Sequence, residues 1–415
     1  MRKLGKYSIG IGDRFGRQGE AQLEAVIRAK LYGVDITPVW NKSYREHQII
    51  GSQPIDTRKE ADEAAQQCGW RDNYFVDADH VGMKTVDHFL DSSDFFTIDV
   101  ADFINNSTND EEVKKFLNQQ QKYIGKLKIP GSDKDFDITE SGVRMIAHKY
   151  LSAVEEAGRI YRHILSKKGG QDFIVEISMD ETDEPQKPVD LFFILAAIAQ
   201  QQIPVQTIAP KFTGRFNKGV DYVGDIQKFT KEFEENLAII NFAREEFELP
   251  ENLKLSIHSG SDKFALYGPI QNALKKYDAG VHLKTAGTTW LEEVIGLAEA
   301  GDDGLALVKE IYHQARERFD ELCGPYADVI DIDIEKLPLP DQVDLWDGKE
   351  LAGTLRHDQT NDLYNDHFRQ LIHVAYKIAA EMRSRFLNAL YKHQNIIAEN
   401  VAENIYERHL KRLFY

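Results

Sequence analysis

Short apolar runs recur along the chain, and each ends in polar or glycine residues before a helical pattern begins. Eight of these runs are rich in β-branched and aromatic residues, at positions 7–12, 34–40, 73–77, 95–100, 172–177, 205–209, 254–257 and 280–285. Continuous apolar runs separated by helices are typical of parallel strands buried on both faces. Eight in succession, without a Gly-x-Gly-x-x-Gly phosphate loop, favour an α/β fold of the TIM type, a (β/α)8 barrel, over an open doubly wound sheet.

Two stretches of the chain do not follow this alternation of apolar runs and helical patterns. An insert between the fourth and fifth runs carries a Pro-Gly turn at 130–131 and a helical pattern over 139–166. The tail that follows the last barrel helix has a further helical pattern over 362–386. We therefore predict one barrel over residues 1–300, with inserted helices at about 103–168. A helical C-terminal extension over 301–415 is expected to pack on this barrel.

Composition narrows the class of protein. The 415 residues carry a formal net charge of −17, which argues against binding to nucleic acid or to an anionic membrane surface. Cys68 and Cys323 form no Cys-x-x-Cys pair, and no apolar run resembles a signal peptide or a membrane span. These features predict a cytoplasmic protein with a small-molecule substrate, and they leave open whether it forms a homo-oligomer.

Polar residues collect where the predicted strands end, which is where a barrel of this kind carries its chemistry. Nearly every run ends in a group that can titrate, bind a metal or bind an anion, and we predict an active site there. These residues are Asp13, Arg14, Asn41, Lys42, Asp77, Asp79, His80, Asp99, Glu176, Asp180, Glu181, Lys211, His258, Asp262, Lys263, His282 and Lys284.

Three histidines, His80, His258 and His282, lie at three strand ends, and Asp79 is the first choice among the carboxylates beside them. Imidazole and carboxylate together suit a divalent transition metal with open coordination positions. The ligands are not close in sequence, so the pattern leaves the metal open among zinc, manganese and nickel. The other interpretation is that one or two of these histidines are buried and hydrogen-bonded to carbonyl groups.

The loops 259–261 and 286–289 each lead into a helix, whose exposed N–H groups and dipole attract an anion. Together with Lys263, they predict a substrate that carries a carboxylate or a phosphate. The alternative is that Ser261 and Thr288 merely cap these helices. The predicted substrate-binding residues are Asp13, Arg14, Asn41, Lys42, Ser259, Gly260, Ser261, Lys284, Gly287 and Thr288.

Several of these segments resemble the tagaturonate epimerase family. The segments are Asp77-Ala78-Asp79-His80-Val81, Phe96-Thr97-Ile98-Asp99, Asp180-Glu181-Thr182, residues 255–264 with His-Ser-Gly-Ser-Asp-Lys-Phe, residues 282–288, and Arg369-Gln370-Leu371-Ile372-His373-Val374. The matches run from about Gly12 to Ile372, whereas the stretch Trp40–Glu46 matches only loosely. The resemblance implies a metal-dependent barrel that interconverts tagaturonate and fructuronate during hexuronate breakdown.

The two sugars differ at C4 of the ketose, whose hydrogen is not acidic because it lies β to the carbonyl. Retro-aldol cleavage of the C3–C4 bond and re-addition to the other face of the aldehyde would invert it. Glu176 and Asp180 are the candidates for acid–base catalysis. Lys263 and Lys284 are the candidates for stabilising the developing oxyanion. Two further functions stay open: an aldose–ketose isomerase on the same type of metal barrel, and a sugar-binding barrel without turnover.

Overall fold

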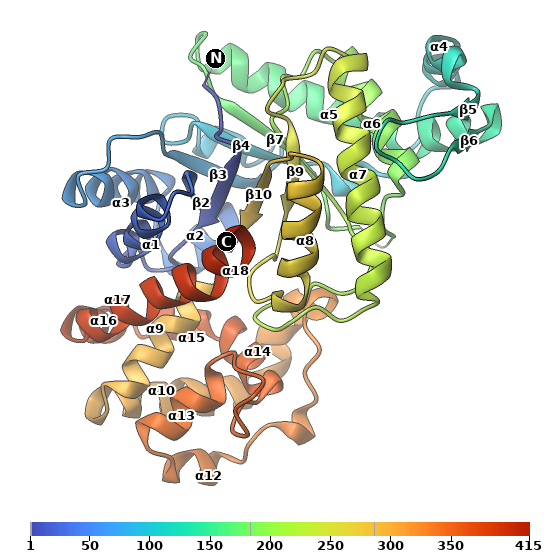
Figure 1. Cartoon of the computed structure of the whole chain (residues 1–415). Coiled ribbons are helices and arrows are strands. Elements are labelled where there is room, and N and C mark those ends of the chain that lie inside the picture. Colours follow the sequence, from blue (N-terminus) through green and yellow to red (C-terminus); the bar gives the residue numbers. More distant parts are fainter. Residues whose placement is uncertain (1, 183, 286) are drawn as a thin grey trace.

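Eight parallel strands close into one barrel in the computed structural model, which describes residues 2–182, 184–285 and 287–415. Around the barrel the strand order is β1-β10-β9-β8-β7-β4-β3-β2. The strands are β1 (Tyr7–Ile11), β2 (Ile36–Ser43), β3 (Phe75–Val81), β4 (Phe95–Asp99), β7 (Ile174–Met179), β8 (Thr207–Pro210), β9 (Lys254–Ile257) and β10 (Val281–Lys284). Each overlaps one of the predicted runs, so the (β/α)8 barrel is confirmed (Figure 1).

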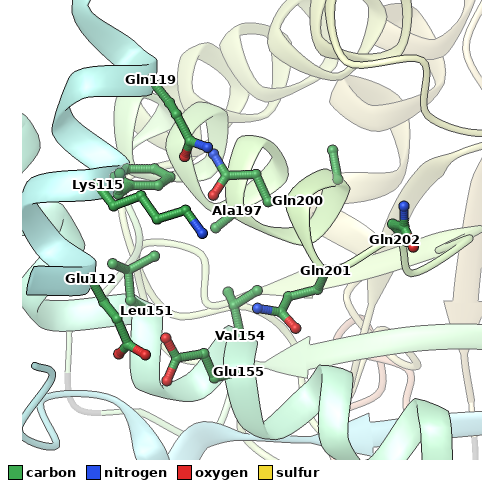
Figure 2. A pocket seen from close by; sticks show the side chains of 12 residues that line it. Glu112, Lys115, Gln119, Leu151, Val154, Glu155, Ala197, Gln200, Gln201 and Gln202 are labelled. Atoms are coloured by element: carbon green, nitrogen blue, oxygen red, sulfur yellow. The ribbon is translucent and has the colours of Figure 1, made fainter.

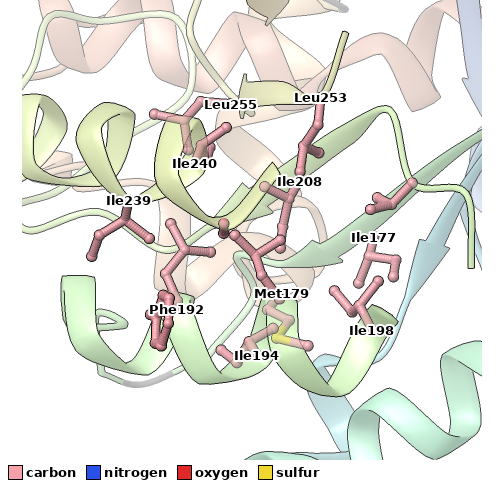
Figure 3. Packing of buried hydrophobic residues seen from close by; sticks show 14 of the residues in the cluster. Ile177, Met179, Phe192, Ile194, Ile198, Ile208, Ile239, Ile240, Leu253 and Leu255 are labelled. Atoms are coloured by element: carbon pink, nitrogen blue, oxygen red, sulfur yellow. The ribbon is translucent and has the colours of Figure 1, made fainter. Parts of the chain in front are cut away.

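The outward faces of the strands pack against a ring of helices. Ile177 and Met179 of β7 and Leu255 of β9 are buried against α6 (Pro188–Gln200) and α7 (Ile226–Glu246) (Figure 3). Side chains alternate between the two faces of a strand, so these outward residues leave their neighbours pointing into the barrel. Further helices beside the strands include α1 (Gly19–Leu31), α2 (Tyr44–Ile50), α3 (Pro54–Gln67), α8 (Phe264–Lys276) and α9 (Thr288–Glu299).

The interior of the barrel changes from apolar to polar along the strands. A buried apolar cluster occupies the end where the strands begin and contains Leu4, Val39, Phe75, Phe95 and Ile174. Further along the same faces come buried polar side chains, namely Asp77, Thr97, Glu176, His282 and Lys284. The register supports this layering, because Thr97 of β4 lies opposite Glu176 of β7. Titratable groups are thus gathered at the carboxyl ends of the strands.

The insert between β4 and β7 is partly helical. It contains α4 (Asp110–Gln120), a two-stranded antiparallel sheet of β5 (Gly125–Leu127) and β6 (Phe136–Ile138), and α5 (Glu140–Lys167). The helix predicted over 139–166 is α5, whereas the small sheet was not expected. Strands of three residues are too short to show a period in the sequence. Figure 1 shows α4 and this sheet at the outer edge of the molecule.

The C-terminal extension is helical and lies on the side of the barrel away from the N-terminus (Figure 1). Its helices are α10 (Asp302–Glu317), α11 (Phe319–Cys323), α12 (Pro340–Leu345), α13 (Gly348–Leu355), α14 (Asp366–Val374), α15 (Tyr376–Glu381), α16 (Ser384–Lys392), α17 (Gln394–Glu403) and α18 (Lys411–Phe414). Helix α17 packs on α9 and α1, and α18 packs on α8. In the described part of the chain, no helix is both long and apolar enough to cross a membrane.

The single helix predicted over 362–386 is wrong, because this segment consists of α14, α15 and the start of α16. The chain turns at Ala375 and again at Arg383, whose φ is 52°. Neither proline nor glycine marks these breaks. The apolar residues on either side of them follow one helical period closely enough to look continuous in the sequence.

Candidate active site

The ammonium group of Lys284 is enclosed by oxygen atoms at the carboxyl end of the barrel. Its Nζ lies 2.9 Å from Asp77 Oδ2 and 2.7 Å from Asp79 Oδ1. Glu176 Oε1 is 3.1 Å away and Thr97 Oγ1 is 2.6 Å away. Burial alone would lower the pKa of Lys284, but the charges of Asp77 and Asp79 outweigh it and hold this pKa well above its ordinary value. Lys284 therefore carries a fixed positive charge that holds three carboxylates together.

Two histidines lie side by side with their rings in an edge-to-face arrangement, and each is held by a carboxylate on one ring nitrogen. His258 Nε2 lies 2.6 Å from Glu176 Oε1, and His80 Nδ1 lies 2.9 Å from Asp99 Oδ2. The two ring centroids are 5.1 Å apart. The second nitrogens, His258 Nδ1 and His80 Nε2, are not hydrogen-bonded to these carboxylates and face Asp180 and Asp79.

These second nitrogens fit a metal site. Ligand atoms of His80, Asp180 and His258 all lie within 4.8 Å of one another. His258 Nδ1 is buried without a hydrogen-bond partner among the described residues, 3.2 Å from Asp180 Oδ2. Metal-binding histidines usually donate their other N–H to a carboxylate, which is the arrangement found here. His80 also forms a second group of this kind with Asp99 and Glu181.

The other two predicted metal ligands lie differently. His282 sits deeper in the barrel, where its Nδ1 is 2.9 Å from Ser8 Oγ and its ring centroid is 5.5 Å from that of Phe95. Burial lowers the pKa of His282 to about 3, so the ring is neutral. Asp79 pairs with the central lysine, and its Oδ1 is 3.9 Å from His80 Nε2. Asp79 thus borders the metal-ligand group, whereas His282 lies one layer below it.

Lys263 does not face an open site. Its buried Nζ donates to the backbone carbonyls of Asn217 at 2.8 Å, Val220 at 2.7 Å and Ser261 at 3.0 Å. An ammonium group has three N–H bonds, and these contacts use all of them. Lys263 therefore ties the loop after β8 to the loop after β9. This geometry favours a structural role over the oxyanion role expected from the sequence.

The neighbouring Asp262 binds the C-terminal extension. Its carboxylate lies 3.0 Å from Arg369 Nη2 and 3.2 Å from His357 Nδ1, and its backbone N–H donates to His409 Nε2 at 3.1 Å. Burial would raise the pKa of Asp262, but the Arg369 guanidinium holds it well below its ordinary value. The loop 259–263 is therefore covered by the extension.

Three of the predicted substrate-binding residues are engaged within the protein or buried. Asp13 accepts backbone N–H groups of its own loop, including that of Gln18 at 2.6 Å. Lys42 Nζ donates to the carbonyl of Arg14 at 3.1 Å. Asn41 is 2% exposed, and its amide has no hydrogen-bond partner among the described residues. Asp13 and Lys42 therefore hold the loop after β1 in place.

The helices that follow the two glycine loops are not capped by the expected side chains. Helix α8 has Lys263 at its N-cap and α9 has Gly287, and neither helix has a side-chain cap. The alternative that Ser261 and Thr288 cap these helices is therefore wrong. Gly260 donates its N–H to the carbonyl of the last residue of β10 at 3.2 Å. Thr288 is buried at the start of α9.

Gly287 lies beside cationic and aromatic groups of the barrel mouth. Its φ is 95°, and a Cβ at this position would be 3.0 Å from Arg14 Nη2 and 2.9 Å from His373 Nε2. The Arg14 guanidinium carbon lies 4.0 Å from the centre of the Tyr376 ring. Ala286, which belongs to the same predicted loop, lies outside the described residues. No strand end precedes Tyr376, so the sequence pattern did not mark it as a site residue.

The surface has one hollow among the outer helices and another beside the barrel mouth. One of about 450 Å³ lies outside the barrel between α4, α5 and α6, with Glu112 and Glu155 on its wall (Figure 2). The other, of about 520 Å³, lies beside the loops that follow β4 and β7, and Glu181 and Asn105 help to line it. The second hollow therefore leads towards a carboxylate of the barrel mouth, whereas the first lies among the outer helices.

Comparisons of sequence and of structure with known proteins all point to the same family. The sequence model of the tagaturonate epimerase family matches residues 1–413. The tagaturonate/fructuronate epimerase of Thermotoga maritima is 30% identical over 426 residues, which cover 98% of this chain and 81% of that protein. A glycerol-complexed crystal structure of the fructuronate-tagaturonate epimerase of Cohnella laeviribosi has a TM-score of 0.80 at 25% identity, over 98% of this chain and 81% of that one.

Proposed function

The chain belongs to the tagaturonate epimerase family and is therefore a carbohydrate epimerase, and we propose that it interconverts tagaturonate and fructuronate with the help of a divalent metal. The observation that carries this proposal is the pair of histidines at the barrel mouth. His80 and His258 each have a carboxylate on one ring nitrogen, and together with Asp180 they offer ligand atoms within 4.8 Å of one another.

The reaction has to invert C4 without removing its hydrogen. Cleavage of the C3–C4 bond leaves its electron pair on C3 as an enediolate, and the C4 hydroxyl loses its proton as C4 becomes an aldehyde. Rotation of the aldehyde presents its other face, and re-formation of the C3–C4 bond returns the proton. The sequence therefore needs a carboxylate near the C4 hydroxyl and positive charge near the C2 and C3 oxygens.

Zinc, manganese or nickel held by His80, His258 and Asp180 would supply Lewis acidity to the carbonyl and the neighbouring hydroxyl of the sugar. In this proposal Asp180 replaces Asp79 as the ligating carboxylate, and His282 takes no part. Glu176 and Asp99 orient the two imidazoles through hydrogen bonds.

Glu181 is the residue we assign to the proton of the C4 hydroxyl. It is exposed in the loop after β7, and one of its oxygens lies within 4.8 Å of ligand atoms of His80 and Asp99. Glu176 suits this role less well, because it is fully buried and already paired with His258. Burial would raise the pKa values of Asp79 and Glu176, but nearby positive charge, chiefly that of Lys284, outweighs it and holds both pKa values below their ordinary values, so these two carboxylates stay ionised at the base of the site.

One incubation tests the proposal. The protein is stripped with a chelator, loaded separately with zinc, manganese and nickel, and mixed with tagaturonate, and the products are identified by NMR. We expect fructuronate from at least one metal-loaded sample and none from the stripped protein. Fructuronate formed equally well after stripping would overturn the metal requirement. An aldose as the product would overturn the epimerase assignment in favour of an aldose–ketose isomerase.

A further inference from the structure

Three cationic side chains gather at one side of the barrel mouth around Tyr326. They are Arg14, in the loop after β1, Arg45, in α2, and Lys218, in the loop after β8. We propose that this cluster is the receptor for the substrate's C6 carboxylate, an inference that rests on the proposed function. The sequence predicted an anion site at the loops 259–261 and 286–289 together with Lys263, but Lys263 binds three backbone carbonyls, whereas Gly287 borders the cluster.

The cluster has more positive charge than the protein neutralises. Arg14 pairs with Glu46 through one guanidinium nitrogen, whereas its buried Nε has no hydrogen-bond partner among the described residues. Within residues 2–182, 184–285 and 287–415, neither Arg45 nor Lys218 forms an ion pair or a side-chain hydrogen bond, and each lies over the ring of Tyr326. In a chain with a net charge of −17, this local excess of positive charge is a suitable site for an anion.

Two tyrosines of the extension form a wall of the receptor. The Tyr326 and Tyr376 hydroxyls are 2.9 Å apart. The Arg45 guanidinium lies 4.9 Å from the Tyr326 ring centre and Lys218 Nζ lies 5.9 Å from it. Burial would raise the pKa of Tyr326, but the positive charges of Arg14 and Arg45 outweigh it and lower this pKa. The same charges would strengthen hydrogen bonds to a bound carboxylate.

The N-terminus of α9 adds a partial positive charge to the proposed receptor. Gly287, the N-cap of α9, lies against Arg14 and His373. A helix N-terminus favours an anion through its free N–H groups and its dipole. Burial and the charge of Arg14 hold the pKa of His373 well below its ordinary value, so this ring stays neutral. Arg14, Arg45 and Lys218 therefore supply the positive charge of the site.

The receptor lies beside the proposed reaction centre. Lys218 interacts electrostatically with Glu181, and Glu181 in turn lies with His80 and Asp99 in the second metal-ligand group. Glu181 is therefore near both Lys218 and His80. In the ketose the carbonyl is C2 and the carboxylate is C6, so C4 lies between the two ends. A sugar held at both ends would present its C4 hydroxyl to Glu181.

The position of the receptor explains how the aldehyde fragment can rotate in the site without dissociating. Cleavage of C3–C4 leaves a three-carbon enediolate and a three-carbon aldehyde that carries the carboxylate. Ion pairs from Arg45 and Lys218 would hold the carboxylate while the aldehyde rotates about its C4–C5 bond. The receptor thus has two effects, selection of an acid sugar and retention of the cleaved fragment.

Neutral replacements of the two free cations test the receptor. Arg45→Gln and Lys218→Gln are each expected to raise the KM for tagaturonate roughly 10- to 150-fold, the scale of a charge-assisted hydrogen bond. Arg45→Lys and Lys218→Arg should recover part of this loss, because charge and not shape is required. Arg71→Gln and Lys3→Gln are matched controls, since both residues are exposed and precede strands at the opposite end of the barrel. Circular dichroism shows that each variant is folded.

Calorimetric titration with tagaturonate separates the two proposals. Folded Arg45→Gln and Lys218→Gln variants with an unchanged KM and unchanged tagaturonate affinity would overturn the receptor while leaving the epimerase function intact. Unaltered protein that binds tagaturonate through Lys218 but forms no fructuronate would support the receptor and overturn the proposed reaction. Equal loss of affinity in the Arg71→Gln control would show a general effect of charge and would also overturn the receptor.

Discussion

Asp262 and Arg369 form a fully buried ion pair between the barrel and the C-terminal extension, with 3.0 Å between Oδ2 and Nη2. Asp262 lies in the loop after β9 and has a φ of 63°, and Arg369 lies in α14. The guanidinium also donates to the carbonyls of Gly219 and Leu355. Gly219 follows Lys218 directly, so this contact helps to position the proposed carboxylate receptor.

Removal of the guanidinium should destabilise the protein strongly. Arg369→Met leaves the Asp262 carboxylate buried without its main partner, a change that typically costs about 3–5 kcal/mol in the free energy of unfolding. Urea unfolding followed by circular dichroism measures this cost. The control is Arg385→Met, which removes an exposed ion pair with Glu310 and should cost less than about 1 kcal/mol. Equal costs for the two variants would contradict a structural role for the buried pair.

His258 and His282, which lie at different depths in the barrel, should differ in their effect on metal binding. His258→Gln is expected to weaken metal affinity by more than about 100-fold, since loss of an outer partner of a ligand already costs 10- to 100-fold. The matched variant His282→Gln should keep its metal, because His282 bonds to Ser8 below the ligand group. Metal content after dialysis against buffered free metal gives both values. Loss of metal from His282→Gln would restore the ligand role expected from the sequence.

Glu181 should be required for turnover and not for metal retention. Glu181→Gln keeps the size of the side chain and removes its basicity, so kcat should fall on the order of 100-fold or more, the scale of a lost general base. Glu184→Gln is the control in the same loop, since Glu184 is exposed and pairs with Lys149. Steady-state kinetics together with metal analysis check both variants. An unchanged kcat in Glu181→Gln would return the base role to Glu176 or Asp180.

Glu60 should make stability depend on pH. Burial and the charge of Asp13 raise the pKa of Glu60 to about 8 in the folded protein, above its ordinary value of 4.5. Between these values the folded state holds a proton that the unfolded state has lost, so its contribution is full below 4.5 and is lost as pH rises through 8. Glu60→Gln should therefore raise Tm by about 2 °C or more at pH 8 and much less at pH 5.

The exposed Glu63 on the same helix is the control for Glu60. Glu63→Gln should change Tm little at either pH, because a solvated carboxylate gains nothing by losing its charge. Scanning calorimetry at both pH values gives the comparison. A Tm gain in Glu60→Gln that is the same at pH 5 and pH 8 would show that the gain comes from packing and not from titration.

The barrel was predictable because its strands are continuous apolar runs with polar ends. Residues 254–257, for example, are predicted and observed as one strand. Strand ends also predicted that His80, His258, Asp180 and Glu181 lie close together, because parallel strands bring their carboxyl ends to one end of the barrel. The depth at which a side chain lies inside the barrel was harder to predict from the sequence. His282 and Lys284 share one face, and the sequence alone does not show which of them reaches the mouth.

Residues supplied by distant segments were not predictable in the same way. Tyr326 and Tyr376 follow no strand end, and their approach to Arg14 depends on how the extension folds back. Lys218 lies far along the loop after β8, so the end of that strand does not mark it. Lys263 looked like a substrate ligand because a lysine beside a glycine loop suits an anion. Its three bonds to backbone carbonyls require the loop after β8, whose path has no signature in the sequence.

Conversion of tagaturonate by the metal-loaded protein in D2O, followed by 1H NMR, tests the central claim most directly. Inversion by C3–C4 cleavage never breaks the C4–H bond, so the account predicts fructuronate that retains its proton at C4. The Glu181→Gln variant should form the same product far more slowly. Deuterium at C4 of the fructuronate, or no fructuronate with any of the three metals, would contradict the account.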